Sequence, residues 1–210
     1  MDNLLPIPNP DRVREACNIF DQKSKTSEDA LSELFSRFPE NTNEGHVLLK
    51  VVALNRLYSA GVLAVEDVAR HIYKNGEEVD YALTTGEQSI VDMIAIVAIK
   101  DKGFNFFSFA TKYCNWHKPD LYAIYDSRVD QYLWSLQLHN RFTDIKHRFE
   151  IRNDYATFHK IMIDFRNYYK LNSFNFKDID KFLWTRDGSA SATKGTAPID
   201  AIKAEPRIEL

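Results

Sequence analysis

The sequence is poor in residues that break helices and in residues that bind metals. Its 210 residues include only seven glycines, seven prolines and two cysteines. Because Cys17 and Cys114 lie far apart, a disulfide framework, a four-cysteine zinc site and a four-cysteine iron–sulfur cluster are excluded. Cys114 and His117 have the spacing of half a zinc site, but no second ligand pair accompanies them. We therefore expect no metal and no other cofactor.

Long apolar runs are also missing. No run approaches the roughly 18 apolar residues that a membrane span needs. The first twelve residues lack the basic start and apolar core of a secretory signal. A hydrophobic fraction of 44% and a charged fraction of 27% are typical of a globular domain. These features predict a cytoplasmic protein that does not contact a membrane.

The charge is unevenly distributed along the chain. Residues 1–99 hold 9 basic and 16 acidic side chains, a net charge of −7, whereas residues 100–186 hold 15 basic and 10 acidic side chains, a net charge of +5. A basic second half is compatible with a surface that faces phosphates, although scattered charges on solvated helices give the same count.

Apolar residues recur mostly at three- and four-residue spacing, which predicts an all-α fold, a compact helical bundle. We find no strand pattern and no hairpin turn dipeptide. Helices are expected to start at Asp11 and at Thr26–Ser27, and to cover 45–58, 65–74, 89–100, 106–116, 127–138, 154–169 and 176–184. Aromatic residues stop at Trp184. We therefore expect one domain over residues 1–186 and a disordered tail over 187–210.

The segment from Lys102 to Trp134 contains the chemistry-bearing pattern, and within it YAIYDSRVDQYL is the most informative stretch. It resembles the helix-hairpin-helix DNA glycosylase superfamily, in particular the adenine mismatch and endonuclease-III-like enzymes. In those enzymes an apolar triplet precedes the catalytic aspartate, and a valine or isoleucine follows three residues later. The resemblance implies that Asp126 is the catalytic residue.

The residue eighteen positions before Asp126 refines this expectation. Members of the superfamily that also cleave the strand carry a nucleophilic lysine there, whereas this chain has Ser108. The resemblance therefore implies a monofunctional DNA glycosylase, which hydrolyses the glycosidic bond of a damaged or modified base without forming a Schiff base. The role could lie in repair or in defence against modified phage DNA.

The resemblance also implies contacts with double-stranded DNA. The family's Gly-x-Gly hairpin is degenerate here, and we expect Asn105 to replace a glycine in a left-handed conformation. A second set of polar and aromatic residues would form the pocket for the extruded base. The expected DNA contacts are Lys102, Gly103, Asn105, Ser108, Lys112 and Arg128, and the expected base pocket is Asn55, Tyr58 and Trp116.

Other interpretations stay open at this point. Asp126 also occupies the position of a helix N-cap, for which Asp is a favoured residue. The degenerate hairpin is compatible with a non-catalytic helix-hairpin-helix DNA-binding module, and the acidic net charge of −3 with a helical protein-interaction domain. We expect a monomer, and the sequence does not identify the base.

Overall fold

The computed structural model describes residues 7–152 and 154–185, and this part of the chain is helical apart from one two-stranded hairpin. The expected all-α fold class is confirmed. The elements are α1 (Pro10–Arg37), α2 (Glu44–Tyr58), α3 (Val65–Lys74), α4 (Gly76–Thr85), α5 (Ser89–Ala95), β1 (Ile96–Ile99), β2 (Lys102–Asn105), α6 (Phe107–His117), α7 (Ser127–Asn140), the 3₁₀ helix η1 (Arg148–Arg152), α8 (Tyr155–Tyr168) and α9 (Phe176–Thr185).

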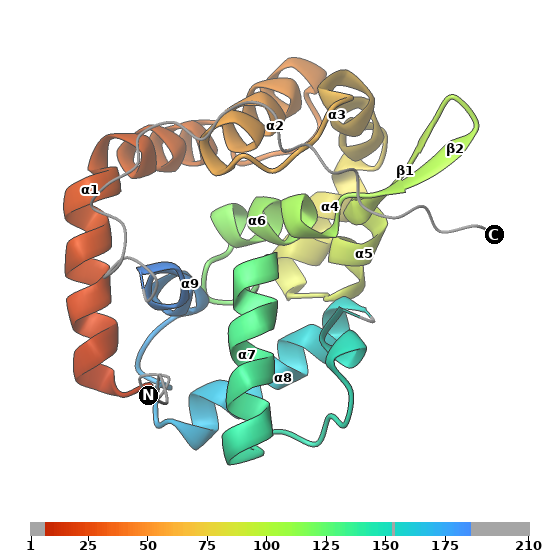
Figure 1. The fold of residues 1–210 in the computed structure, drawn as a ribbon. Helices are drawn as coiled ribbons and strands as arrows, with labels where there is room; N and C mark the ends of the chain where they lie inside the picture. The colour runs from red at the N-terminus through yellow and green to blue at the C-terminus, as the bar shows by residue number, and fades with distance from the viewer. Residues whose placement is uncertain (1–6, 153, 186–210) are drawn as a thin grey trace.

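Helix α1 is longer than expected. Its N-cap is Asn9, which accepts a hydrogen bond from the backbone N–H of Arg12 at 3.0 Å, and Pro10 occupies the first turn. The separate helix start predicted at Thr26–Ser27 is wrong, because α1 continues through these residues. Figure 1 shows that α1 instead changes direction sharply along its length. The bend allows one helix to border two groups of helices.

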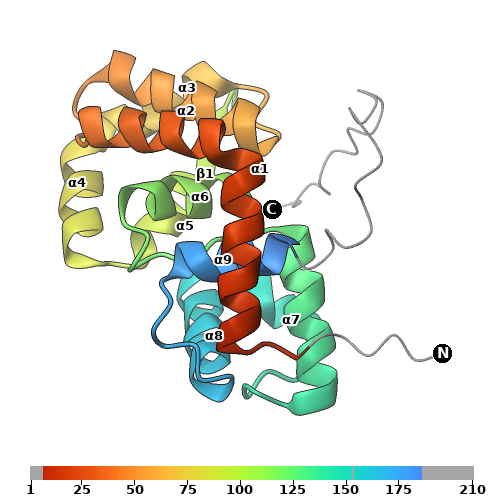
Figure 2. The same ribbon diagram turned by 90° about the vertical axis from the view of Figure 1, so that its left-hand side faces the viewer.

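The two halves of α1 pack on different partners. The helix contacts α9 and also α2 and α6. Figures 1 and 2 show α2 to α6 gathered beside the second half of α1, and α7, α8 and α9 gathered beside the first half. The connection between α6 and α7 therefore lies where the two groups meet. This junction contains Asp126.

The hairpin corrects two expectations. The helix predicted for 89–100 ends at Ala95, and the chain continues as β1, which pairs antiparallel with β2. The turn residues Lys100 and Asp101 have φ values of 47° and 62°, as a two-residue type I′ turn requires. Asn105 lies in β2 and has no positive φ, so it does not replace a glycine in the expected way.

The core is continuous across both groups of helices and is rich in aromatic side chains. Tyr113, Tyr122 and Tyr155 are fully buried, and each hydroxyl is hydrogen-bonded. None of the described helices is long and apolar enough to cross a membrane. The predicted tail, residues 187–210, lies outside the described residues.

Candidate active site

Asp126 stands at the start of α7, where its side chain caps the helix. Oδ1 accepts hydrogen bonds from the backbone N–H groups of Arg128 at 2.9 Å and Val129 at 2.8 Å. Oδ2 makes no hydrogen bond to any residue that the structure describes. Capping thus occupies one carboxylate oxygen and leaves the other available to a ligand.

Lys112 of α6 lies beside this turn. Its Nζ donates a hydrogen bond to Ser108 Oγ at 2.7 Å and lies 3.4 Å from the carbonyl oxygen of Tyr125, the residue before Asp126. The side chain is buried, with only 4% of Lys112 exposed. Ser108 occupies the position at which strand-cleaving members of the glycosylase superfamily carry their nucleophilic lysine. Its hydroxyl accepts a hydrogen bond from Lys112, which lies one helical turn further along α6.

Residues from α1, α2 and α9 extend this polar group. The Tyr58 hydroxyl donates to Glu28 Oε1 at 3.2 Å and accepts a hydrogen bond from the Lys177 ammonium. Lys177 also forms an ion pair with Glu28 Oε2 at 3.3 Å, and its Nζ lies 4.0 Å from the centroid of the Trp116 ring. The two aromatic side chains thus share one cation.

Asp180 lies one turn after Lys177 on α9 and is 4% exposed. Its Oδ1 is buried without a hydrogen-bond partner in the described part of the chain. Burial raises the pKa of this carboxyl to about 6, an effect that the charges of Lys177 and Lys112 oppose and the charge of Asp126 reinforces. We refer to the residues of this region as the Asp126 cluster: Glu28, Tyr58, Lys112, Trp116, Asp126, Lys177 and Asp180.

Burial also lowers the pKa values of the two lysines of the cluster. It lowers the pKa of Lys112, while the negative charges of Asp126 and Asp180 act in the opposite direction. It lowers the pKa of Lys177 in the same way, against the charges of Glu28 and Asp180. A buried amine of lowered pKa holds its proton less tightly than a surface lysine does, which favours nucleophilic or acid–base chemistry.

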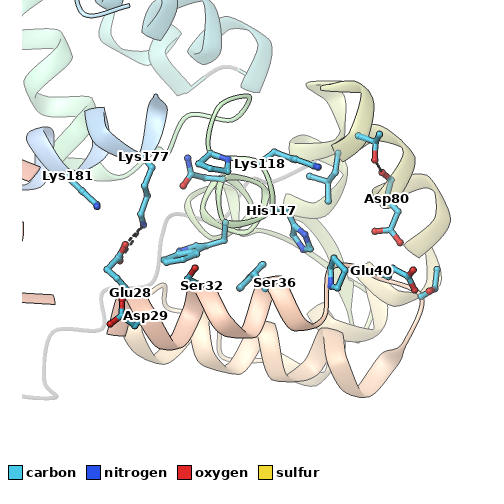
Figure 3. A pocket seen from close by; sticks show the side chains of 18 of the residues that line it. Glu28, Asp29, Ser32, Ser36, Glu40, Asp80, His117, Lys118, Lys177 and Lys181 are labelled. Carbon is cyan, nitrogen blue, oxygen red and sulfur yellow. Dashed lines mark hydrogen bonds and ion pairs between the residues drawn. The ribbon is translucent and has the colours of Figure 1, made fainter. Parts of the chain in front are cut away.

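A groove of about 1160 Å³ runs along α1 next to the cluster. Figure 3 shows it bordered by α1, α9, the end of α6 and α4, with Lys177 and Lys181 near one end and Asp80 near the other. Glu28, Trp116 and Lys177 belong to both the groove and the Asp126 cluster, whereas Asp126 and Lys112 do not line the groove. The groove is thus adjacent to the Asp126 cluster without being lined by Asp126 itself.

Of the three predicted base-pocket residues, two lie in the Asp126 cluster and one does not. Tyr58 and Trp116 both lie in the Asp126 cluster, with ring centroids 6.3 Å apart. Asn55 does not, because its amide closes the loop after α2: Oδ1 accepts from the Val62 N–H at 2.9 Å, and Nδ2 donates to the Val62 carbonyl at 2.8 Å. The side chain of Asn55 therefore holds the loop and takes no part in the Asp126 cluster.

The predicted DNA contacts also differ in their exposure to solvent. Lys102, Gly103 and Asn105 are exposed on β2, and Arg128 is exposed at the start of α7, where its guanidinium lies 5.1 Å from the centroid of the Trp184 ring. Lys112 is the exception. Because it is buried, it cannot be a surface contact for phosphate, and its neighbours make it part of the candidate active site instead.

Sequence reasoning missed three members of the cluster: Glu28, Lys177 and Asp180. Glu28 lies on α1, and the other two lie on α9, so residues of the first and last described helices join the cluster. One feature of the sequence could have indicated the two α9 residues: Lys177 and Asp180 are three residues apart on a helix face that also includes the buried Phe176. Within the described residues, no group of three or more His, Cys, Asp or Glu side chains is placed to hold a metal.

Comparisons with known proteins find a similar protein and a matching family model. An uncharacterized protein of Haemophilus influenzae (strain ATCC 51907 / DSM 11121 / KW20 / Rd) is 35% identical over 130 residues, which is 62% of this chain and 60% of that relative. No solved structure matches. The family model described as HI_0787_N, N-terminal domain, matches residues 12–121, which include Glu28, Tyr58, Lys112 and Trp116 and end before Asp126. This match covers more than half of the sequence, and the chain belongs to the HI_0787_N family.

Proposed function

We propose that the protein is a DNA N-glycosylase that hydrolyses the bond between a damaged or modified base and its deoxyribose. The observation that carries the proposal is the free Oδ2 of Asp126, on a carboxylate that is fixed by its own helix and coupled to the buried Lys112. A carboxylate that only caps a helix has no need of a buried amine beside it. We expect such an enzyme to act in the cytoplasm.

The geometry suits the charge that develops in this reaction. Cleavage of an N-glycosidic bond gives the sugar oxocarbenium character, which a fixed anion stabilises. Asp126 Oδ2 supplies the anion and can orient the attacking water. Because Oδ1 is held by two backbone N–H groups, the carboxylate needs little reorganisation when the charge forms.

The rest of the cluster supports binding of an extruded base. Trp116 and Tyr58 offer aromatic surface, and Lys177, Glu28 and Asp180 offer donors and acceptors for a base edge. The DNA would approach along the side where Arg128 is exposed. The unpartnered Oδ1 of Asp180 supports this assignment, because a buried acceptor without a donor is costly unless a ligand supplies one.

A strand-cleaving glycosylase is a second candidate, and the position of Lys112 favours it. Its amine is buried, has a lowered pKa and lies beside the Asp126 turn, as a Schiff-base nucleophile would need. The absence of a lysine at position 108 favours the hydrolytic enzyme. Borohydride treatment during turnover separates the two: the hydrolytic enzyme forms no covalent adduct with DNA, whereas the strand-cleaving enzyme is trapped at Lys112.

The proposal is tested with duplexes that each carry one modified base. The protein is incubated with the panel, and released bases are identified by mass spectrometry. We expect release of at least one base, leaving an abasic site in an intact strand. Tight DNA binding without release from any duplex would contradict the proposal and favour a non-catalytic DNA-binding module.

A further inference from the structure

A buried lysine lies behind the end of the groove away from the Asp126 cluster, where it contacts the lining residues Glu40 and His117, and the proposed base removal does not involve it. Lys50 is 0% exposed. Its Nζ donates to the Glu40 carbonyl at 3.0 Å and to Asn41 Oδ1 at 2.7 Å, and it lies 3.2 Å from His117 Nε2. Burial lowers the pKa of Lys50 to about 8, which keeps the amine protonated at neutral pH. An ammonium has three donors, and here each has an acceptor.

This arrangement fixes the state of His117. An ammonium group has no acceptor lone pair, so His117 Nε2 must accept the Lys50 hydrogen bond, and the proton of the neutral ring must reside on Nδ1. Burial, and next the charge of Lys50, hold the pKa of His117 well below its usual range, so the ring stays neutral. The described residues provide no acceptor for Nδ1–H. Figure 3 shows the His117 ring projecting into the groove.

The charges around this end of the groove restrict the ligand. Glu40, Glu77 and Asp80 line it with carboxylates. Lysines at the other end are engaged in ion pairs: Lys181 with Asp21 at 2.6 Å, Lys177 with Glu28 at 3.3 Å and Lys25 with Asp29 at 3.1 Å. Lys118 also lines the groove next to His117, so three carboxylates stand against one lysine in the lining at this end. A phosphate would therefore meet net repulsion at the His117 end and cations already neutralised at the other.

The groove also has an acceptor that lacks a donor. Asn115 of α6 lines it. The Oδ1 of this buried side chain has no hydrogen-bond partner among residues 7–152 and 154–185, whereas its Nδ2 donates to the Tyr122 carbonyl at 2.6 Å. The Phe35 ring lies edge-on to His117, with centroids 4.9 Å apart. The site thus combines aromatic surface, one fixed donor and several acceptors.

We propose that the groove binds an uncharged or cationic amino-substituted nitrogen heterocycle of the adenine or cytosine type, without a phosphate. His117 Nδ1–H donates to a ring nitrogen, and the neighbouring amino group donates to the carboxylates of Glu40 and Asp80. Bases with a carbonyl and a ring N–H in these places, such as hypoxanthine and uracil, present the reverse pattern and bind more weakly. This binding does not depend on base removal at Asp126. If the protein is a glycosylase, the groove is suited to hold a released base.

Direct binding of free bases to the full chain tests the proposal. Adenine, cytosine, hypoxanthine, uracil and dAMP are titrated separately and followed by ligand-observed NMR. We expect adenine or cytosine to bind at least ten-fold more tightly than its carbonyl counterpart, and dAMP to bind more weakly than adenine. No binding of adenine or cytosine at millimolar concentration, or tighter binding of dAMP, would overturn the proposal.

Two variants locate the site. Ser32→Trp fills the groove from an exposed position on α1 without touching the Lys50 contacts, and should abolish binding. Glu33→Trp, one residue along and outside the groove lining, is its control and should bind like the wild type. His117→Phe should weaken binding about ten-fold, whereas His139→Phe on α7 should not change it. Undiminished binding in Ser32→Trp would show that the ligand sits elsewhere and overturn the proposal.

Discussion

The molecule buries two lysine-centred polar groups, and they differ in how completely their hydrogen bonds are satisfied. Around Lys50, every ammonium donor has an acceptor, and Asn41 and Tyr113 close the network with Asp80. In the Asp126 cluster, the buried Oδ1 of Asp180 lacks a partner among the described residues. Oδ2 of the half-buried Asp126 also makes no hydrogen bond to them. A closed network stabilises a fold, whereas unsatisfied buried groups are costly and are retained where a ligand completes them. We therefore assign stability to Lys50 and its three acceptors, and chemistry to the Asp126 cluster. The Nδ1–H of His117, which has no acceptor among the described residues, is the part of the first group that is left to a ligand.

The largest effect on stability is expected at Lys50. Lys50→Ala leaves the Glu40 carbonyl and His117 Nε2 without the Lys50 donor, and it removes one of the two donors of Asn41 Oδ1. We expect a loss of about 3 kcal/mol in the free energy of unfolding, measured by urea denaturation. Lys160→Ala, which removes an exposed ion pair with Asp164, should cost about 0.5 kcal/mol. A loss below about 1 kcal/mol at Lys50 would remove the contrast between the two groups.

A second test adds one methyl group beside the Lys50 network. A Cβ at Gly76 would lie 2.3 Å from the backbone oxygen of Asn41, which cannot move without disturbing the contact between Asn41 and Lys50. Gly76→Ala should therefore destabilise the protein by about 2 kcal/mol in the same assay. Gly103→Ala on β2 has open space around its Cβ and should be nearly neutral. Equal stability of the two variants would show that the network tolerates displacement.

The Asp126 cluster should instead make the free energy of unfolding depend on pH. The raised pKa of Asp180, about 6, means that its stabilising contribution is present below the unfolded pKa near 4 and is lost as pH rises through 6. Between pH 4 and 7, wild type should lose roughly 2–3 kcal/mol that Asp180→Asn does not lose, since one pKa unit corresponds to about 1.4 kcal/mol. Asp144→Asn, at a fully exposed carboxyl, should follow the wild-type profile. If the stability of wild type and of Asp180→Asn changes with pH in parallel, the claim that burial raises the pKa of Asp180 is contradicted.

The smallest expected effect concerns the side from which DNA approaches. Arg128→Ala should weaken DNA binding a few-fold for all sequences and lower the salt slope by about one unit. Lys102→Ala tests the hairpin in the same way. Lys25→Ala, on the groove side of α1, should leave affinity and slope unchanged. A larger loss at Lys25 than at Arg128 would place the DNA over the groove and reverse our assignment of the two sides.

Local sequence patterns predicted much of the fold. Helix α3 has the predicted bounds, and the expected N-cap at Asp126 forms, because both depend on spacing within a few residues. The hairpin was missed because its turn is Lys100–Asp101 rather than an Asn–Gly type of dipeptide. Helix α4 was missed because its polar first turn gives little apolar periodicity, although Val79, Ala82 and Leu83 are buried.

The candidate site was predictable only in part. Asp126, Tyr58 and Trp116 could be named from the resemblance and from local pattern. The burial of Lys112 could not, because it depends on neighbours distant in sequence, including Asp180 of α9. Asn55 was assigned to the pocket from the resemblance, as a polar residue near the loop after a long apolar helix, yet its hydrogen bonds are local. Residues that act through long-range contacts need the fold before their role can be argued.

The central claim is that Asp126 acts chemically through the oxygen that capping leaves free. Asp126→Asn retains capping ability and removes the charge, and Asp154→Asn makes the same change at the N-cap of α8, where Oδ1 accepts from the Thr157 N–H at 2.7 Å. The decisive measurement is single-turnover base release by both variants, with thermal stability measured alongside. We predict that release falls about 100-fold, or about 2.7 kcal/mol, for Asp126→Asn alone, with both variants close to wild type in stability. Wild-type release by a stably folded Asp126→Asn variant would contradict the account.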